Sequence, residues 1–186
     1  ETDYNIVKYF DQNSSIKSDQ FYEYGKESFK NVLWQRFLIG NRILKTGKTY
    51  IYSDTDIVII RNFIQDTLDS LKTKNIDCVI QFNGRDCCTG YFAMKPTRNT
   101  LNFNLKLLER LNYQKYTTNQ PFFNGILIKN NLLNVMLLDR NKYPNGKYYY
   151  DNYKQIENDC YLIHFNCLVG YENKINKMKF YNKWLI

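Results

Sequence analysis

The chain has 186 residues, of which 44% are hydrophobic and 24% charged, and these values suit one globular domain with a sizeable buried core. The net charge of +8 favours anionic partners such as nucleotides, but the basic residues are dispersed, so we expect no nucleic-acid partner. No apolar run approaches the ~20 residues that span a bilayer, and we therefore expect no transmembrane segment. Five cysteines without a CxxC pair predict no zinc site, and free thiols favour the cytoplasm, the host's if the chain is viral.

Predicted strands and helices alternate along the chain. We expect strands at residues 4–10, 50–60, 77–82, 89–95, 134–139 and 161–165, and helices at 28–44, 63–74, 96–111, 119–128 and 172–183. Turns are expected at residues 83–86 and 143–146. This alternation predicts a single α/β domain over residues 1–186, with a mixed, mostly parallel sheet flanked by helices.

The most informative stretch is YIYSDTDIVII at residues 50–60, which has Asp54 and Asp56 at its centre. In a strand, side chains two residues apart point to the same side, so both carboxylates would face one way. Two like charges between apolar residues resist burial unless a cation lies between them, and Mg²⁺ or Mn²⁺ is the natural partner. The alternative is an Asp-Thr-Asp turn between two strands, because Asp is common in turns.

Further polar residues lie near the ends of other predicted strands. Ligands of α/β sheets bind at the carboxyl ends of strands, where the Asp pair, Gly90 and His164 could share one crevice. His164 is the single histidine, and imidazole beside carboxylates is compatible with Mn²⁺, although an isolated histidine is more often structural. Lys174 follows Gly170 at the start of a helix, where it could neutralise a diphosphate; a solvated lysine is the alternative.

These motifs together carry a resemblance to a known family. A helix with Arg36 precedes KTGKTYIYSDTDIVIIRN, and the segments CTGYFAMKPT, NQPFFN, LDRNKYPNG and IHFNCLVGYENK follow, with Trp184 near the end. The chain resembles the nucleotide-diphospho-sugar transferase family, glycosyltransferases of GT-A fold with a DxD motif, over about residues 28–184. Each motif is weak alone, but their order and spacing make the set fairly specific.

The resemblance implies a donor site built from residues of these motifs. The metal ligands would be Asp54, Asp56 and His164, with Asp54 contacting either the metal or the ribose. The groups that hold the donor would be Arg36 at the sugar, Gly90 lining the sugar site, and Gly170 and Lys174 at the diphosphate. Gln120, near the reacting face of the sugar, would be a catalytic residue.

Two departures from the family pattern stand out. Asn119 lies where the family usually has Asp, so a carboxylate expected near the donor or acceptor is missing. GT-A domains also carry a first strand and helix that hold the nucleobase, whereas residues 4–10 resemble the second strand. We therefore expect the usual first strand to lie outside this chain or to be absent. An inverting reaction would need a carboxylate base, for which Asp139 and Asp86 are the candidates; a retaining reaction would need none.

We therefore expect a Mn²⁺- or Mg²⁺-dependent glycosyltransferase. It would move a sugar from a nucleotide-diphosphate sugar, most simply a UDP-sugar, to a hydroxyl group of a glycan or protein acceptor. The DTDIV segment also fits the nucleophile motif of a haloacid-dehalogenase-type phosphatase, although the later acidic pair of that class is missing. A catalytically inactive nucleotide-sugar-binding module is the third alternative, because a fold alone does not secure activity.

Overall fold

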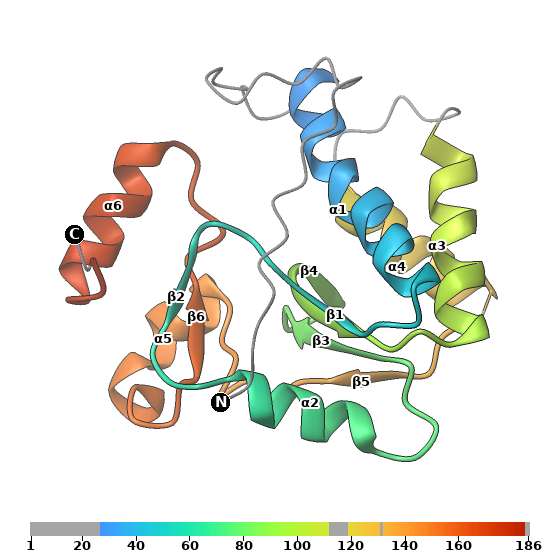
Figure 1. Cartoon of the computed structure of the whole chain (residues 1–186). Coiled ribbons are helices and arrows are strands. Elements are labelled where there is room, and N and C mark those ends of the chain that lie inside the picture. Colours follow the sequence, from blue (N-terminus) through green and yellow to red (C-terminus); the bar gives the residue numbers. More distant parts are fainter. Residues whose placement is uncertain (1–26, 112–118, 131, 185–186) are drawn as a thin grey trace.

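The computed structural model describes residues 27–111, 119–130 and 132–184 (Figure 1). Within these residues the chain forms six helices and six strands, in the α/β arrangement expected from the sequence. The strand predicted at residues 4–10 lies outside the described residues, so the extent of the domain at that end stays a prediction.

The main sheet has four strands in the order β1-β4-β3-β5. These are β1 (Tyr50–Ser53), β4 (Cys87–Met94), β3 (Cys78–Phe82) and β5 (Val135–Leu137). Strand β4 is antiparallel to both of its neighbours, and only β3 and β5 run parallel among these four. Every residue of β4 is buried, because the sheet is covered on both faces.

The expectation of a mostly parallel sheet is wrong, since the main sheet is mixed and mostly antiparallel. Residues 83–86 join β3 directly to β4, and so short a connection can only join antiparallel strands. A parallel pair needs a crossover of about a dozen residues or more. The β3–β5 pair meets this condition because two helices lie between β4 and β5 in the chain. The alternation of elements predicted the fold class but not the strand directions.

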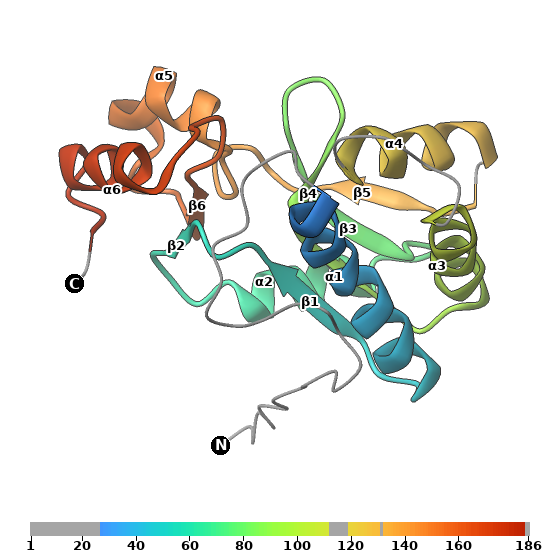
Figure 2. The same ribbon diagram turned by 90° about the horizontal axis from the view of Figure 1, so that it is seen from above.

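Helices cover both faces of the main sheet (Figures 1 and 2). Helices α1 (Glu27–Lys45), α3 (Arg98–Leu111) and α4 (Asn119–Asn130) lie on one face, and α2 (Ile64–Lys72) lies on the other. All four were predicted from the sequence to within a few residues at each end. Their apolar stripes meet a sheet whose side chains alternate between the two faces, which produces three layers.

Strand β4 supplies side chains to both of the layers around it. Phe92 packs with Phe37 of α1 and Phe123 of α4 on the three-helix face. The neighbouring Tyr91 points to the opposite face, where it belongs to the cluster that includes Leu71 of α2. This alternation along one buried strand is what fixes the two helical layers against a single sheet.

A second, smaller unit, here called the ribbon unit, lies beside the main sheet (Figure 2). Its strands β2 (Ile57–Ile59) and β6 (Leu162–His164) pair antiparallel, and helices α5 (Gly146–Ile156) and α6 (Tyr171–Phe180) accompany them. The single strand predicted at residues 50–60 is therefore two strands, β1 and β2, in two different sheets.

Helix α5 was not predicted from the sequence, which indicated only a turn at residues 143–146. Its sequence, GKYYYDNYKQI, is rich in tyrosine, and aromatic residues are only moderate helix formers. Tertiary structure compensates in two ways. The side chain of Asn145 accepts a hydrogen bond from Tyr148 N over 3.0 Å and caps the helix, and Tyr149 is fully buried in the ribbon unit.

None of the helices described above is both long and apolar enough to cross a membrane.

Candidate metal centre and donor site

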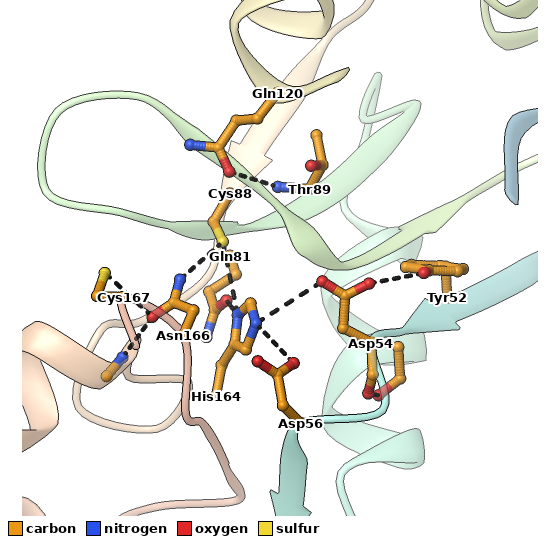
Figure 3. Close-up of polar contacts among 12 residues, drawn as sticks. Tyr52, Asp54, Asp56, Gln81, Cys88, Thr89, Gln120, His164, Asn166 and Cys167 are labelled. Carbon is orange, nitrogen blue, oxygen red and sulfur yellow. Dashed lines mark hydrogen bonds and ion pairs between the residues drawn. The ribbon is translucent and has the colours of Figure 1, made fainter. Parts of the chain in front are cut away.

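Asp54 and Asp56 lie in the turn where the chain passes from the main sheet to the ribbon unit (Figure 3). Asp54 extends the main sheet, because its N–H donates to Gly90 O over 2.7 Å. Asp56 belongs to the ribbon unit, because its carbonyl accepts a hydrogen bond from Phe165 N over 2.9 Å. The turn that the sequence offered as an alternative to a metal site is therefore present, and it keeps the two carboxylates close together.

The imidazole of His164 faces both carboxylates (Figure 3). The register of the ribbon pairs Ile57 with His164, which brings the preceding Asp56 beside the ring. His164 Nε2 lies 3.2 Å from Asp56 Oδ1 and 3.7 Å from Asp54 Oδ2, and the three ligand atoms all lie within 4.8 Å of one another. Two carboxylate oxygens and one imidazole nitrogen at these separations fit the ligand preferences of a divalent cation.

The predicted convergence of the Asp pair, Gly90 and His164 is confirmed. The reason given for it, that the ends of parallel strands meet at one edge, is wrong because β1 and β4, and β2 and β6, pair antiparallel. A Cβ atom at Gly90 would overlap the His164 ring and lie 2.9 Å from Asp54 Oδ2. Opposite Gln81, the register of β3 and β4 shifts, and residues 89–91 form a bulge at this point. Glycine is therefore required here by the cluster's own side chains, and its place in a sugar site stays a prediction.

Arg36 and Tyr52 both contact Asp54. Arg36 Nη1 lies 3.3 Å from Asp54 Oδ1, and the hydroxyl of Tyr52 donates to the same oxygen over 2.6 Å. The Arg36 side chain is only 3% exposed, and it also donates to Thr89 O over 2.6 Å. Its position is thus buried rather than on the surface, and here it orients Asp54; a contact with the donor sugar stays a prediction.

Lys174 forms an ion pair with the other carboxylate. Its Nζ lies 2.6 Å from Asp56 Oδ2, and its side chain is 30% exposed. Lys174 lies in the first turn of α6, which follows Gly170, whose φ of +90° favours glycine. The alternative of a freely solvated lysine is therefore wrong. Because its side chain is still partly exposed, the ammonium group of Lys174 stays accessible to an anion.

The contacts among Asp56, His164 and Lys174 stabilise the charged form of Asp56 and of His164. Burial alone would lower the pKa of His164, but its hydrogen bond and ion pair with Asp56, together with its contact with Cys88, raise the pKa to about 10. Burial alone would raise the pKa of Asp56, but the hydrogen bonds and charges of His164 and Lys174 hold it below its usual range. Without a metal ion, two protein cations therefore neutralise the carboxylate that a divalent cation would bind.

The two predicted catalytic residues lie in different surroundings. Gln120, at the start of α4, reaches β4, because its Oε1 accepts from Thr89 N over 3.3 Å (Figure 3). Its Nε2 lies 3.4 Å from Asp86 Oδ1. Asp139 lies in the turn after β5, where its carboxylate accepts from Asn141 N over 2.9 Å. Gln120 is thus bonded to the strand that carries Gly90, Asp139 caps its own turn, and catalysis by either stays a prediction.

Sequence patterns did not point to three residues of the site: Tyr52, Gln81 and Cys88. Tyr52 could have been found because it precedes Asp54 by two residues and so shares its side of a strand. Gln81 is the only amide in the buried strand CVIQF, and a buried amide must find partners. Cys88, whose Sγ lies 3.6 Å from His164 Nδ1, gave no such signal.

The fold is similar to those of solved glycosyltransferases. The glycosyltransferase involved in glycosylation of the major capsid of PBCV-1 is similar with a TM-score of 0.60 and 13% identity, over 86% of this chain and 81% of that one. The glycosyltransferase GlyE of Streptococcus pneumoniae is similar with a TM-score of 0.53 and 10% identity, over 81% of this chain and 43% of that one. Identities this low establish the fold class alone.

The chain belongs to the nucleotide-diphospho-sugar transferase family, whose model matches residues 3–178. This match confirms the resemblance seen in the sequence motifs and extends it towards the N-terminus.

Curated relatives in two organisms match nearly the whole chain. One is a UDP-galactose:fucoside alpha-3-galactosyltransferase of Dictyostelium discoideum, 24% identical over 94% of this chain and 31% of the relative. Another is the UDP-D-xylose:L-fucose alpha-1,3-D-xylosyltransferase MGP4 of Arabidopsis thaliana, 24% identical over 92% of this chain and 54% of the relative. The chain thus spans between about a third and about half of the length of these relatives.

Proposed function

We propose that this chain is the catalytic domain of a metal-dependent glycosyltransferase that moves a sugar from a UDP-sugar to a hydroxyl group of a glycan or protein acceptor. The observation that carries the proposal is the convergence of Asp54, Asp56 and His164, with ligand atoms within 4.8 Å of one another, in a member of this family. The turn between β1 and β2 supplies both aspartates and the distant strand β6 supplies His164, so the cluster is a product of the fold rather than of one local sequence.

The ligand atoms of Asp54, Asp56 and His164 suit Mn²⁺. Imidazole with carboxylates is compatible with Mn²⁺ and less typical of Mg²⁺, which prefers oxygen ligands throughout. A divalent ion bound here would offset the negative charge that develops on the leaving diphosphate.

The chain's own residues have complementary roles in this proposal. Lys174 would move from Asp56 to a phosphate oxygen of the donor, since its ammonium is partly exposed at the N-terminal end of α6. Arg36 and Tyr52 hold Asp54 in a fixed direction from the side of the main sheet. Substrate would therefore meet a site whose charged groups are already oriented.

The relatives suggest which substrates to test first. Their names specify UDP-galactose or UDP-xylose as donor and a fucoside or fucose as acceptor. These compounds are the first candidates for this chain. A fucoside acceptor would offer one of its sugar hydroxyl groups as the nucleophile.

The two alternatives to a transferase are weakened to different degrees. The phosphatase alternative is disfavoured by the family match and by the contact of both aspartates with His164, which leaves neither as an isolated nucleophile. The inactive binding module differs from the proposal only in catalysis, and Asn119 in place of the family's usual Asp is the reason to test it.

The test combines binding with turnover. UDP and Mn²⁺ together should raise the Tm of the wild-type chain, and Asp56→Ala should abolish the rise because it removes a ligand. Asp69→Ala is the matched control, since Asp69 is a 53% exposed carboxylate on α2 that pairs with Lys72. It should retain the full shift.

UDP release from UDP-galactose and UDP-xylose, with and without a fucoside, then measures catalysis. Release that depends on Mn²⁺ and increases with the acceptor supports the transferase. Binding without release would indicate the inactive module, hydrolysis of an aryl phosphate would indicate the phosphatase, and the lack of any shift with UDP and Mn²⁺ would contradict donor binding itself.

A further inference from the structure

Gln81 lies directly behind the imidazole of His164 (Figure 3). It belongs to β3 and is fully buried. Its Oε1 lies 2.9 Å from His164 Nδ1, on the side of the ring opposite to the nitrogen that faces the carboxylates. A buried amide next to a candidate metal ligand raises the question of which of its ends faces the ring.

The backbone fixes the direction of this amide. Gln81 Nε2 donates to two carbonyl oxygens, Tyr143 O over 3.1 Å and Pro144 O over 2.9 Å. Carbonyl oxygens only accept hydrogen bonds, so the NH₂ group must face them and the amide oxygen must face His164. An amide oxygen also only accepts, and it follows that His164 Nδ1 carries a hydrogen.

The carbonyl groups that orient the amide are themselves held in place. Pro144 O also accepts a hydrogen bond from His164 N over 3.1 Å, so one carbonyl fixes both the backbone of His164 and the amide behind its ring. The hydroxyl of Tyr143 donates to Asp66 Oδ2 over 2.8 Å, which ties the same segment to α2. The support behind the imidazole is therefore continuous from the ring to the main sheet and α2.

We propose that Gln81 is a positioning residue for the candidate metal centre. It holds the hydrogen of His164 on Nδ1 and the ring in the orientation that directs Nε2 at Asp54 and Asp56. Because the hydrogen on Nδ1 is held by Gln81, the ring nitrogen that can offer a lone pair to a divalent cation is Nε2. This inference rests on the proposed metal-dependent function.

Three variants test the proposal through the affinity for Mn²⁺ alone, measured by electron paramagnetic resonance titration. Gln81→Met keeps the length of the side chain but removes the acceptor, and it should weaken Mn²⁺ binding by about 10–100-fold. Gln81→Glu keeps an oxygen facing Nδ1 and loses the NH₂ donors, so its affinity should stay close to that of wild type. Thr100→Val is the matched control.

Thr100 suits this control because it is fully buried and its hydroxyl donates to Lys95 O over 2.6 Å, at the start of α3. Its loss also leaves a backbone carbonyl without a side-chain donor. Thr100→Val should lower the melting temperature and leave the Mn²⁺ affinity unchanged, which separates loss of stability from loss of positioning.

The single histidine allows a direct spectroscopic test. With ¹⁵N-labelled histidine and Cd²⁺ as a diamagnetic substitute for Mn²⁺, long-range ¹H–¹⁵N spectra should show a hydrogen on Nδ1 and the metal on Nε2. Gln81→Glu should preserve this pattern, and Gln81→Met should give a mixture of both ring forms.

The outcomes distinguish this inference from the proposed function. If wild type binds no Mn²⁺ either alone or together with UDP, both are overturned. If wild type binds Mn²⁺ and Gln81→Met binds it equally well, only the positioning role is overturned. The positioning role alone is also overturned if Gln81→Glu is as weak as Gln81→Met, because Gln81 would then serve to support the two carbonyls, or if the metal lies on Nδ1.

Discussion

The main sheet and the ribbon unit differ in what holds them and in what they bring to the site. The main sheet is built around a continuous aromatic layer. The ring of buried Phe92 lies 5.2 to 6.3 Å from four other aromatic rings, those of Tyr52, Tyr50, Phe37 and Phe123. The ribbon unit also buries tyrosines, but its contribution to the site is charged: Asp56, His164 and Lys174.

The two regions also supply different kinds of groups to the site. The main sheet and the helix α1 that covers it contribute groups that orient the ligands, namely Arg36, Gln81 and the carbonyl of Gly90, whereas the ribbon unit contributes most of the charge. Asp54 is hydrogen-bonded into the first region and Asp56 into the second. A cation held by both carboxylates would therefore join the two regions, and each prediction below separates their contributions.

The largest effect is expected from Phe92→Ala in the aromatic layer. The substitution removes a fully buried ring, and it should lower the free energy of unfolding by about 3–5 kcal/mol. Urea denaturation followed by circular dichroism measures this change. A loss below about 1 kcal/mol would mean that the layer is not the main source of stability.

The next effect is the pH dependence of metal binding. Because the pKa of His164 is raised to about 10, the ring is protonated near neutral pH, and a metal ion must displace that proton. Apparent Mn²⁺ affinity should rise about tenfold for each pH unit between about pH 6 and about pH 8, while Asp56 stays ionised throughout. Isothermal titration calorimetry in buffers of different ionisation enthalpy would count the released proton. An affinity that does not change with pH would contradict the ion pair between His164 and Asp56.

Lys174→Met should have opposite effects on the two ligands. In the metal-free site its ammonium competes for Asp56 Oδ2, so its loss should tighten the binding of Mn²⁺ alone. Its loss should also weaken the binding of UDP in the presence of Mn²⁺, by about tenfold, because one charge-assisted phosphate contact disappears. Calorimetric titrations with each ligand measure both effects, and weaker binding of Mn²⁺ alone would show that Lys174 supports the metal site rather than the donor.

The smallest effect is expected from Phe180→Ser on α6. Phe180 is 74% exposed, so it contributes little to the core of the ribbon unit even though it has the same side chain as Phe92. The free energy of unfolding should change by about 0.5 kcal/mol or less. A larger loss of unfolding free energy would mean that Phe180 makes a contact that stabilises the fold, and it would contradict the expected difference between Phe180 and Phe92.

Periodicity and charge in the sequence were enough to find most of the helices and the charged residues of the site. The apolar stripe of residues 28–44 and the apolar positions of residues 96–111 are local patterns, so they predicted α1 and α3 well. Asp54 and Asp56 were found because like charges between apolar residues require a partner. His164 was found as the single histidine at the end of a strand, and Lys174 by its place after Gly170 at the start of a helix.

The strand directions were predicted wrongly although the short connection at residues 83–86 allows only an antiparallel pair. The other features that were not predicted depend on distant parts of the chain. Helix α5 depends on the burial of Tyr149 and on the Asn145 cap, which overcome a moderate local propensity. The role of Gln81 depends on two carbonyl groups more than sixty residues away in the chain.

By itself, the sequence determined which chemical groups the site contains, because residue type fixes charge, ligand softness and hydrogen-bonding capacity. Only the tertiary structure decided how these groups are arranged. Asp54 and Asp56 face His164 because a turn, not a continuous strand, carries them between two sheets. The reason is physical: a local sequence sets the preferences of neighbouring residues, whereas the distance between a carboxylate and an imidazole more than a hundred residues apart is set by register and packing.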